Sequence, residues 1–187
     1  GGARSNVKFG CLNNPVVAVR EDESPNDELC IDDTDFTATF DGSKWTVRWK
    51  WINGQPVLRN QCGEYAVSDS CREKYNQEIQ QWITKGWLEL YNEEVHGEVS
   101  GVVPLMAVVQ HNKDGKVGPV MDYSRELNKY VVSNPGNDVA VGQEKLREWR
   151  TIGDQACILD LQKAYLQLHV DVPLQRFQAV RFNGRLY

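Results

Sequence analysis

The stretch at residues 158–170 constrains the fold most, because it joins an apolar strand pattern to a helical pattern at a single acidic residue. Its sequence, Ile-Leu-Asp-Leu-Gln-Lys-Ala-Tyr-Leu-Gln-Leu-His-Val, predicts a buried strand that ends at Asp160 and turns into a short amphipathic helix. A strand end fixes a carboxylate rigidly, and the chain reversal leaves its oxygens facing a cleft, as a metal ligand requires. The alternative is that Asp160 caps the helix that follows.

The composition is that of a soluble globular protein with one substantial core, or with one core and an appendage. The chain has 187 residues, of which 41% are hydrophobic and 25% are charged. No apolar run approaches the roughly 18 residues that a membrane span needs. The N-terminus also lacks the basic and then apolar order of a signal peptide. We therefore expect a cytoplasmic protein with no membrane partner.

The charge is distributed unevenly along the chain. A formal net charge of −5 argues against nonspecific binding of nucleic acid, because neutralisation of phosphates supplies most of that affinity. Residues 1–100 contain 10 basic against 17 acidic side chains, whereas residues 101–187 contain 11 against 9. The small basic excess therefore lies in the C-terminal part of the chain.

The cysteine and histidine residues show no spacing typical of a zinc site. The five cysteines are scattered and odd in number, no Cys-x-x-Cys occurs, and the three histidines are isolated from one another. We expect reduced thiols.

The N-terminal part divides into an acidic lead and a hairpin. Residues 1–35 are acidic and poor in large apolar side chains, which predicts a flexible linker. Ile31-Asp32-Asp33 superficially resembles a pair of catalytic aspartates, but it lacks a flanking apolar strand and we expect no catalytic role. Residues 36–51 alternate around Asp41-Gly42, which predicts a β-hairpin. Its tryptophans either dock the hairpin onto the body, with the cations left solvated, or form a stacking platform for single-stranded nucleic acid.

Further along, the sequence predicts a helix, two more hairpins and a short charged helix. Ser-Cys-Arg-Glu at residues 70–73 resembles a capping box, and it precedes a helix with apolar positions at Tyr75, Ile79 and Trp82 that stops at Gly86. A β-rich run at residues 102–110 returns through a polar turn into residues 117–123. A loop at residues 134–137 precedes the charged helix at residues 144–150, and Asn183-Gly184 is a strong hairpin turn signal.

Four motifs in this order resemble the fingers and first palm motif of a reverse transcriptase. They are Val-Pro-Leu-Met-Ala-Val-Val at residues 103–109, Gly-Lys-Val-Gly-Pro-Val-Met-Asp-Tyr-Ser-Arg-Glu-Leu-Asn at 115–128, Glu-Lys-Leu-Arg-Glu-Trp-Arg at 144–150 and Asp-Leu-x-Lys-Ala-Tyr-Leu-Gln at 160–167, followed by Phe-Gln-Ala-Val at 177–180. The resemblance covers residues 45–187. It is closest to the polymerases of invertebrate LTR retrotransposons of the Pao/BEL or Ty3 kind. It implies an α+β fold with a flexible linker at residues 1–35, a β-hairpin connector at 36–68, fingers at 69–155 and an incomplete palm sheet at 156–187.

The resemblance also implies roles for individual residues. Asp160 would be catalytic and would bind two Mg²⁺ ions together with the carbonyl of Leu161. The amides of Lys163 and Ala164 would contact the triphosphate of a dNTP, with help from Lys113 and Lys116 in the fingers turn. Tyr165 would be the steric gate at the 2′ position of the sugar, although it could instead belong to the core. Gln178 would lie near an RNA or DNA template-primer.

Two departures from the family pattern weaken the expected nucleotide grip. Gly118 stands where the family has an arginine, and a lost charge-assisted hydrogen bond costs about 1.5–3 kcal/mol. Ser124 splits a family run and would move Arg125 to the other face if that segment is a strand.

The aromatic-x-Asp-Asp motif that completes the metal site does not occur after Asp160 in this sequence. One carboxylate does not offset the repulsion between two divalent ions, so we expect the chain as given to be inactive in polymerisation. We therefore expect a polyprotein fragment in the cytoplasm or, by family, in a virus-like particle. The alternative is a remnant that binds nucleic acid or a protein partner without chemistry.

Overall fold

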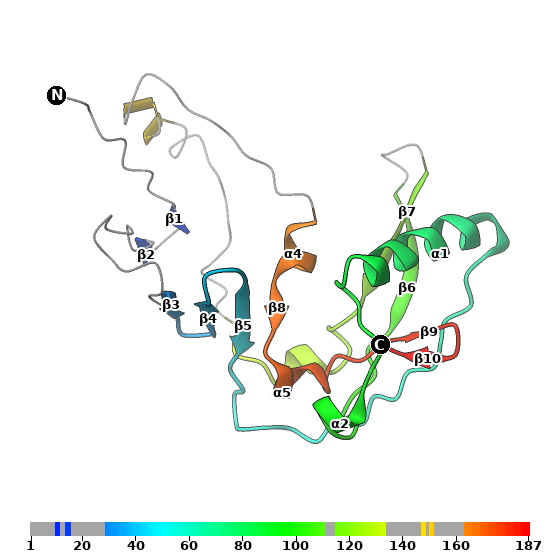
Figure 1. Cartoon of the computed structure of the whole chain (residues 1–187), viewed down its shortest axis with the longest axis horizontal. Coiled ribbons are helices and arrows are strands. Elements are labelled where there is room, and N and C mark those ends of the chain that lie inside the picture. The colour runs from blue at the N-terminus through cyan, green and yellow to red at the C-terminus, as the bar shows by residue number, and fades with distance from the viewer. Residues whose placement is uncertain are drawn as a thin grey trace.

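The computed structural model describes residues 10–11, 14–15, 29–110, 115–133, 147–148, 150–151 and 163–187 (Figure 1). These residues form an α+β fold, as predicted. At the N-terminal end, β1 (Gly10–Cys11) and β2 (Asn14–Pro15) pair antiparallel. The predicted strand through Asp160 and the loop at residues 134–137 lie outside the described residues. The described residues at 147–148 and 150–151 are helical, in agreement with the charged helix predicted there.

The predicted N-terminal hairpin is confirmed as the centre of a four-stranded sheet. Strands β4 (Phe36–Phe40) and β5 (Trp45–Trp49) pair antiparallel around Gly42, whose φ of 94° suits glycine. The Asp41 carboxylate accepts hydrogen bonds from the amides of Lys44 and Ser43 at 3.0 and 2.9 Å, and these bonds lower its pKa to about 2. The turn chemistry in the sequence therefore fixes the register of this hairpin.

Two further strands extend this sheet on either side of the hairpin. Strand β3 (Leu29–Asp32) pairs antiparallel with β4, so the ordered sheet begins at Leu29 and the expected flexible linker does not extend to residue 35. Strand β8 (His169–Val170) pairs parallel with β5. The sequence-based boundaries assigned β5 to a connector and β8 to the palm, yet the two strands share one sheet. An ion pair between Arg48 and Asp171 at 2.7 Å adds to this junction.

Helix α1 (Asp69–Thr84) packs on the second hairpin, which β6 (Leu105–Gln110) and β7 (Lys116–Met121) form. Its buried residues are those that the periodicity predicted, namely Tyr75, Ile79 and Trp82. The predicted capping box is wrong: the N-cap is Ser68, and no side chain caps the first turn. The helix ends before Gly86, whose φ is 70°.

The remaining elements are short. They are α2 (Glu93–His96), the 3₁₀ helix η1 (Leu127–Lys129), α4 (Ala164–Gln167), α5 (Val172–Gln175), β9 (Arg181–Phe182) and β10 (Arg185–Leu186). Asn183 and Gly184 join β9 to β10 with positive φ at both positions, so the predicted hairpin turn is confirmed. The Glu64 carboxylate accepts hydrogen bonds from both turn amides, at 2.8 and 2.9 Å.

Among the residues that the structure describes, two clusters of buried side chains form the core. The larger cluster joins α1 to the β6–β7 hairpin and to Val180 and Phe182. The smaller one surrounds Phe177, which is 1% exposed and contacts Trp51 edge to face at 5.0 Å between ring centroids. Trp49 packs against the same cluster, so the alternative in which the hairpin tryptophans dock onto the body is confirmed for Trp49 and Trp51.

The change of face considered for Arg125 applied only to a strand, and this segment is not a strand. Residues 124–126 form a turn, and Asp122 before it accepts hydrogen bonds from the amide and hydroxyl of Ser124 and lies 3.5 Å from Arg125. These bonds to Ser124 are the main cause of a lowered Asp122 pKa. Ser124 therefore stabilises a turn instead of reversing the faces of a strand.

Within the described residues, no helix is long and apolar enough to cross a membrane. The three cysteines whose side chains are described, Cys30, Cys62 and Cys71, are free thiols, as predicted.

Gly101 provides a test of the smaller core, because a Cβ at this position would lie 2.6 Å from Leu58 Cδ1 and 3.1 Å from the Phe177 carbonyl oxygen. We expect Gly101→Ala to lower the free energy of unfolding by about 1–3 kcal/mol, as overpacking does. Gly63→Ala is the matched control, since nothing lies within 4 Å of its Cβ and its φ is not positive. It should leave the stability unchanged or raise it by up to about 1 kcal/mol. Urea unfolding compares the two variants, and equal midpoints would contradict this packing.

Candidate functional site

A cavity of about 210 Å³ lies between the chain that follows α1, the end of β7 and the segment from α4 to α5. Figure 1 shows α4, β8 and α5 running between β5 and the unit of α1 with the β6–β7 hairpin, with β8 as the strand of the four-stranded sheet next to β5. Aromatic and imidazole side chains make up seven of the sixteen residues that line the cavity, namely Trp87, Tyr91, His96, Tyr123, Tyr165, His169 and Tyr187. Flat rings around a small cavity favour a planar ligand, because such a ligand can stack on them.

Tyr165 lies on α4 at the edge of this cavity. Its neighbour Leu166 packs against the larger core cluster, and adjacent positions on a helix point in different directions. Tyr165 is consequently 93% exposed. The alternative that Tyr165 belongs to the core is therefore wrong. Its ring is free to contact a ligand.

Gln178 lines the same cavity as Tyr165, so the structure brings together two residues that the sequence analysis singled out separately. Its neighbours Phe177 and Ala179 are each 1% exposed, and this burial fixes the backbone on both sides of Gln178. Ala164 is the first residue of α4 and is partly buried, and it does not line the cavity.

Lys163 and Lys116 converge on one carboxylate of α1. Lys163 precedes α4 in the left-handed conformation with φ of 53°, and its ammonium group binds Glu78 Oε1. The same oxygen accepts a hydrogen bond from Trp82 Nε1 at 3.1 Å. Burial raises the pKa of Glu78, but hydrogen bonds from Lys163 and Trp82 and the charges of Lys163 and Lys116 outweigh it and lower the pKa. Glu78 was not singled out by the sequence analysis, because a glutamate within an amphipathic helix carries no local signal of a partner 85 residues away.

His96 and Tyr91 form a second part of the cavity wall that sequence reasoning missed. Their rings lie 5.2 Å apart, and the Tyr91 hydroxyl donates to the Gly97 carbonyl at 2.9 Å. Burial is the main cause of a raised Tyr91 pKa. His96 Nδ1 is buried and has no hydrogen-bond partner among the described residues. An unpaired buried polar atom at a cavity wall favours a water molecule or a ligand there.

The remaining predicted site residues are not placed. Asp160, Leu161 and Lys113 lie outside the described residues, so the proposed Mg²⁺ site rests on the sequence alone. Across the described ranges, no three His, Cys, Asp or Glu side chains gather where they could hold a metal ion.

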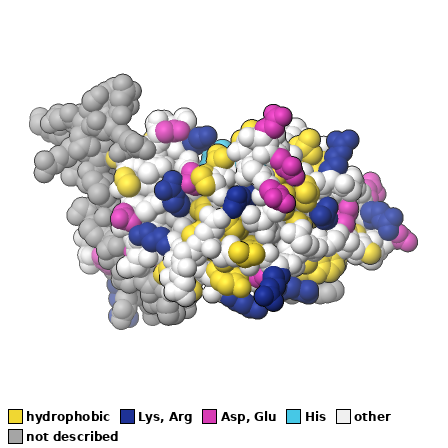
Figure 2. All heavy atoms as spheres, turned by 90° about the horizontal axis from the view of Figure 1, so that it is seen from below, with side chains coloured by type: hydrophobic (Ala, Val, Ile, Leu, Met, Phe, Trp, Pro, Cys, Tyr) yellow, Lys and Arg dark blue, Asp and Glu magenta, His cyan; other side chains and the backbone are white. Residues whose placement is uncertain are grey.

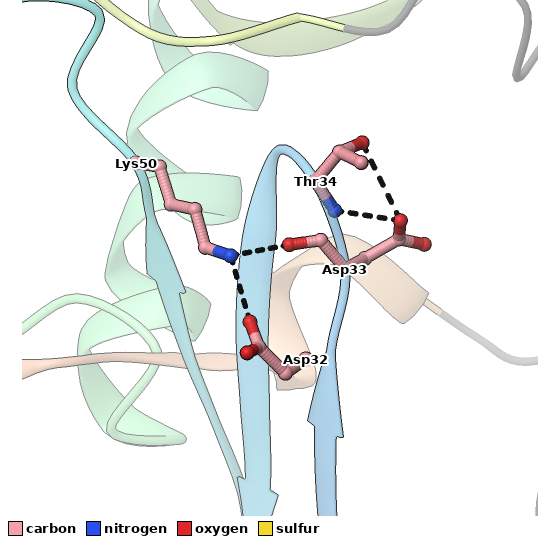
Figure 3. Close-up of polar contacts among 4 residues, drawn as sticks. All are labelled: Asp32, Asp33, Thr34 and Lys50. Atoms are coloured by element: carbon pink, nitrogen blue, oxygen red, sulfur yellow. Dashed lines mark hydrogen bonds and ion pairs between the residues drawn. The ribbon is translucent and has the colours of Figure 1, made fainter.

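The acidic pair Asp32 and Asp33 has a structural role in the described fold (Figure 3). Lys50 Nζ contacts Asp32 Oδ1 at 2.7 Å and also binds the carbonyl oxygen of Asp33. The Asp33 carboxylate accepts a hydrogen bond from the amide of Thr34 at 2.7 Å. These contacts tie β3 to the end of β5. The hairpin cations Lys50 and Arg48 therefore form ion pairs, whereas we expected a solvated face.

Comparisons with protein-family models, with curated proteins and with solved structures found no match to this chain.

Tyr123, a residue of the cavity wall, makes the free energy of unfolding of the chain sensitive to alkaline pH. Burial raises its pKa to about 12 from 10.0. Between these values the unfolded chain releases the phenol proton while the folded chain retains it, so the free energy of unfolding falls as pH rises. We expect Tyr123→Phe to make this fall shallower. Urea unfolding from pH 8 to about pH 11.5 measures it, and parallel curves for wild type and variant would show that Tyr123 does not titrate as stated.

Proposed function

We propose that this chain is the fingers and first palm part of the reverse transcriptase of an LTR retrotransposon, an RNA-directed DNA polymerase that binds template-primer and dNTP. The order of the motifs from residue 103 to residue 180 supports this function. In the family such motifs build a nucleotidyl transfer site. The α+β composition of the described fold is compatible with it.

The exposure of Tyr165 is the observation that carries the proposal. A steric gate must present its ring to the sugar of the incoming nucleotide, and a core residue would not. Tyr165 is 93% exposed at a cavity that Gln178 also lines. A deoxyribose and a ribose differ at the 2′ position alone, so a ring placed against that carbon is sufficient to reject the hydroxyl.

The convergence of Lys116 and Lys163 gives secondary support. One lysine comes from the fingers hairpin and the other from the start of α4, and both act on Glu78. Positive groups from two separate elements suit a ligand that bridges them, such as a triphosphate. Asp160 would hold Mg²⁺, which supplies charge stabilisation to the leaving pyrophosphate and activation to the primer hydroxyl.

Binding of an RNA–DNA primer-template tests the nucleic-acid part of this proposal on the chain itself. We expect affinity to fall as salt rises, because each neutralised phosphate contributes about 0.9 to the slope of log affinity against log salt. Lys116→Ala should reduce that slope by about 1. Lys129→Ala is the control, since Lys129 is also exposed but lies on η1. Fluorescence anisotropy over a salt series measures both variants, and equal slopes would remove Lys116 from the interface.

Primer extension tests the polymerase part in a polypeptide that also supplies an aromatic-x-Asp-Asp motif. We expect Asp160→Asn to abolish magnesium-dependent extension, because the carboxylate would be lost as a ligand of both metals. Tyr165→Ala should retain extension while relaxing the preference for dNTP over rNTP by at least about ten-fold. Tyr130→Ala is the control, because Tyr130 is 37% exposed and does not line the cavity. Undiminished extension by Asp160→Asn would refute the assignment.

A nucleic-acid-binding module without chemistry is the second candidate, and the aromatic wall of the cavity favours it. Base stacking on aromatic rings needs no metal. Figure 2 shows acidic and basic side chains interspersed over the face in view, so binding there would depend on local sites and not on one broad basic field. The protein-interaction alternative is weaker, because β8 already pairs with β5 of the tryptophan hairpin and so occupies a strand edge that a partner strand could otherwise extend.

A further inference from the structure

A polar groove lies between α1 and the start of β7, and none of its lining residues lines the aromatic cavity. It measures about 430 Å³, and Lys74, Gln77, Glu78, Gln81, Lys116 and Val117 line it. Lys74 and Glu78 are one helical turn apart on α1, so their side chains share a face. Lys116 reaches the groove from β7, the opposite wall.

The positive charge in this groove exceeds the negative charge. Lys74 and Lys116 are exposed and have no ion-pair partner among the described residues. Lys163 is engaged by Glu78, whose side chain is 19% exposed. Glu78 is thus the one carboxylate that lines the groove, where it binds the Lys163 ammonium group, while Lys74 and Lys116 line the groove beside it. The two lysines that line the groove therefore have no ion-pair partner within the described part of the chain, which favours the binding of an anion from solution.

The geometry points to Glu78 as an internal counter-ion that occupies part of a polyphosphate site formed by Lys74, Lys116 and Lys163. A polyphosphate would take over Lys163 from Glu78 and bind the two exposed lysines at the same time. This inference deepens the proposed function, because Lys116 and Lys163 belong both to the polyphosphate site and to the proposed triphosphate contacts. The identity of the natural ligand rests on the proposed function.

A polyphosphate fits this site better than a single carboxylate does. Lysine binds phosphate as a point charge, and three lysines on separate elements require a ligand with several charged oxygens along its length. The side-chain amide of Gln81, which has no partner among the described residues, adds a hydrogen-bond donor. A ligand that carries more negative charge than the single carboxylate of Glu78 is attracted more strongly by the three lysines, and it can therefore displace Glu78 from Lys163.

Glu78→Gln separates the charge of Glu78 from its shape. The amide oxygen of glutamine still accepts the hydrogen bond from Trp82, so the change removes the competition for Lys163 and keeps the packing. We expect Glu78→Gln to bind tripolyphosphate at least about ten-fold more tightly than wild type, the scale of one charge-assisted hydrogen bond. Lys74→Ala combined with Lys116→Ala should weaken binding by a similar factor.

Isothermal titration calorimetry of the full chain with tripolyphosphate measures these affinities. Glu94→Gln is the matched control, because it removes the same charge from an exposed position on α2 and should leave the affinity as in wild type. Unchanged or weaker binding by Glu78→Gln would overturn the inference, and so would an absence of binding by every form. Equal gains for Glu78→Gln and Glu94→Gln would also overturn it, because net charge alone would explain them.

Nuclear magnetic resonance of the lysine ammonium groups in the wild-type chain gives a second readout that does not depend on a variant folding. Tripolyphosphate should shift the Lys163 signal as its partner changes, and an unshifted signal at saturation would overturn the competition. Tripolyphosphate carries no base or sugar. If the chain fails to bind primer-template but Glu78→Gln binds tripolyphosphate more tightly, the proposed function is refuted and the inference about the groove stands. If the chain binds primer-template but Glu78→Gln gains no affinity, the inference about the groove is refuted and the proposed function stands.

Discussion

The contact between Trp51 and Phe177 holds the two ends of the described fold together. The two rings meet edge to face at 5.0 Å, and Phe177 is 1% exposed. An aromatic pair of this kind adds about 0.5–1.5 kcal/mol beyond the burial of its area. Because Trp51 follows β5 and Phe177 follows α5, the same contact places the four-stranded sheet against the C-terminal segment. The parallel pairing of β5 with β8 joins the same two parts of the chain.

The aromatic cavity follows from that junction. Residues on α4, β8 and α5 form one wall, and these elements are anchored at one end by β5 and at the other by the core around Phe177. The opposite wall comes from the chain that leaves α1 at Gly86. Tyr165 can remain exposed because its neighbour Leu166 supplies the apolar contact that holds α4 in place. The packing of Leu166 therefore holds α4 in place while the neighbouring Tyr165 stays exposed.

The sequence predicted the hairpins and the long helix well, because each depends on local chemistry. Asp41 and Gly42 supply a turn whose carboxylate satisfies the turn amides, and Asn183 and Gly184 tolerate positive φ. The prediction failed at the start of α1, where a capping box at Ser70 was expected and Ser68 is the N-cap. Two serines at positions 68 and 70 leave the boundary of the helix ambiguous, since each could cap it. It also failed at residues 29–32, because a short acidic strand is stabilised by its partner strand and by Lys50, which the local composition does not show.

The sequence by itself determined the local elements and the motif that resembles a reverse transcriptase, including Tyr165 and Gln178. The tertiary structure decided which distant residues meet. Residues 78 and 163 form one ion pair across 85 positions, and His96 and Tyr187 line one cavity although neither belongs to a recognisable motif. The physical reason is that periodicity and turn chemistry act over a few residues, whereas burial and charge pairing join any residues that the packed core brings within reach.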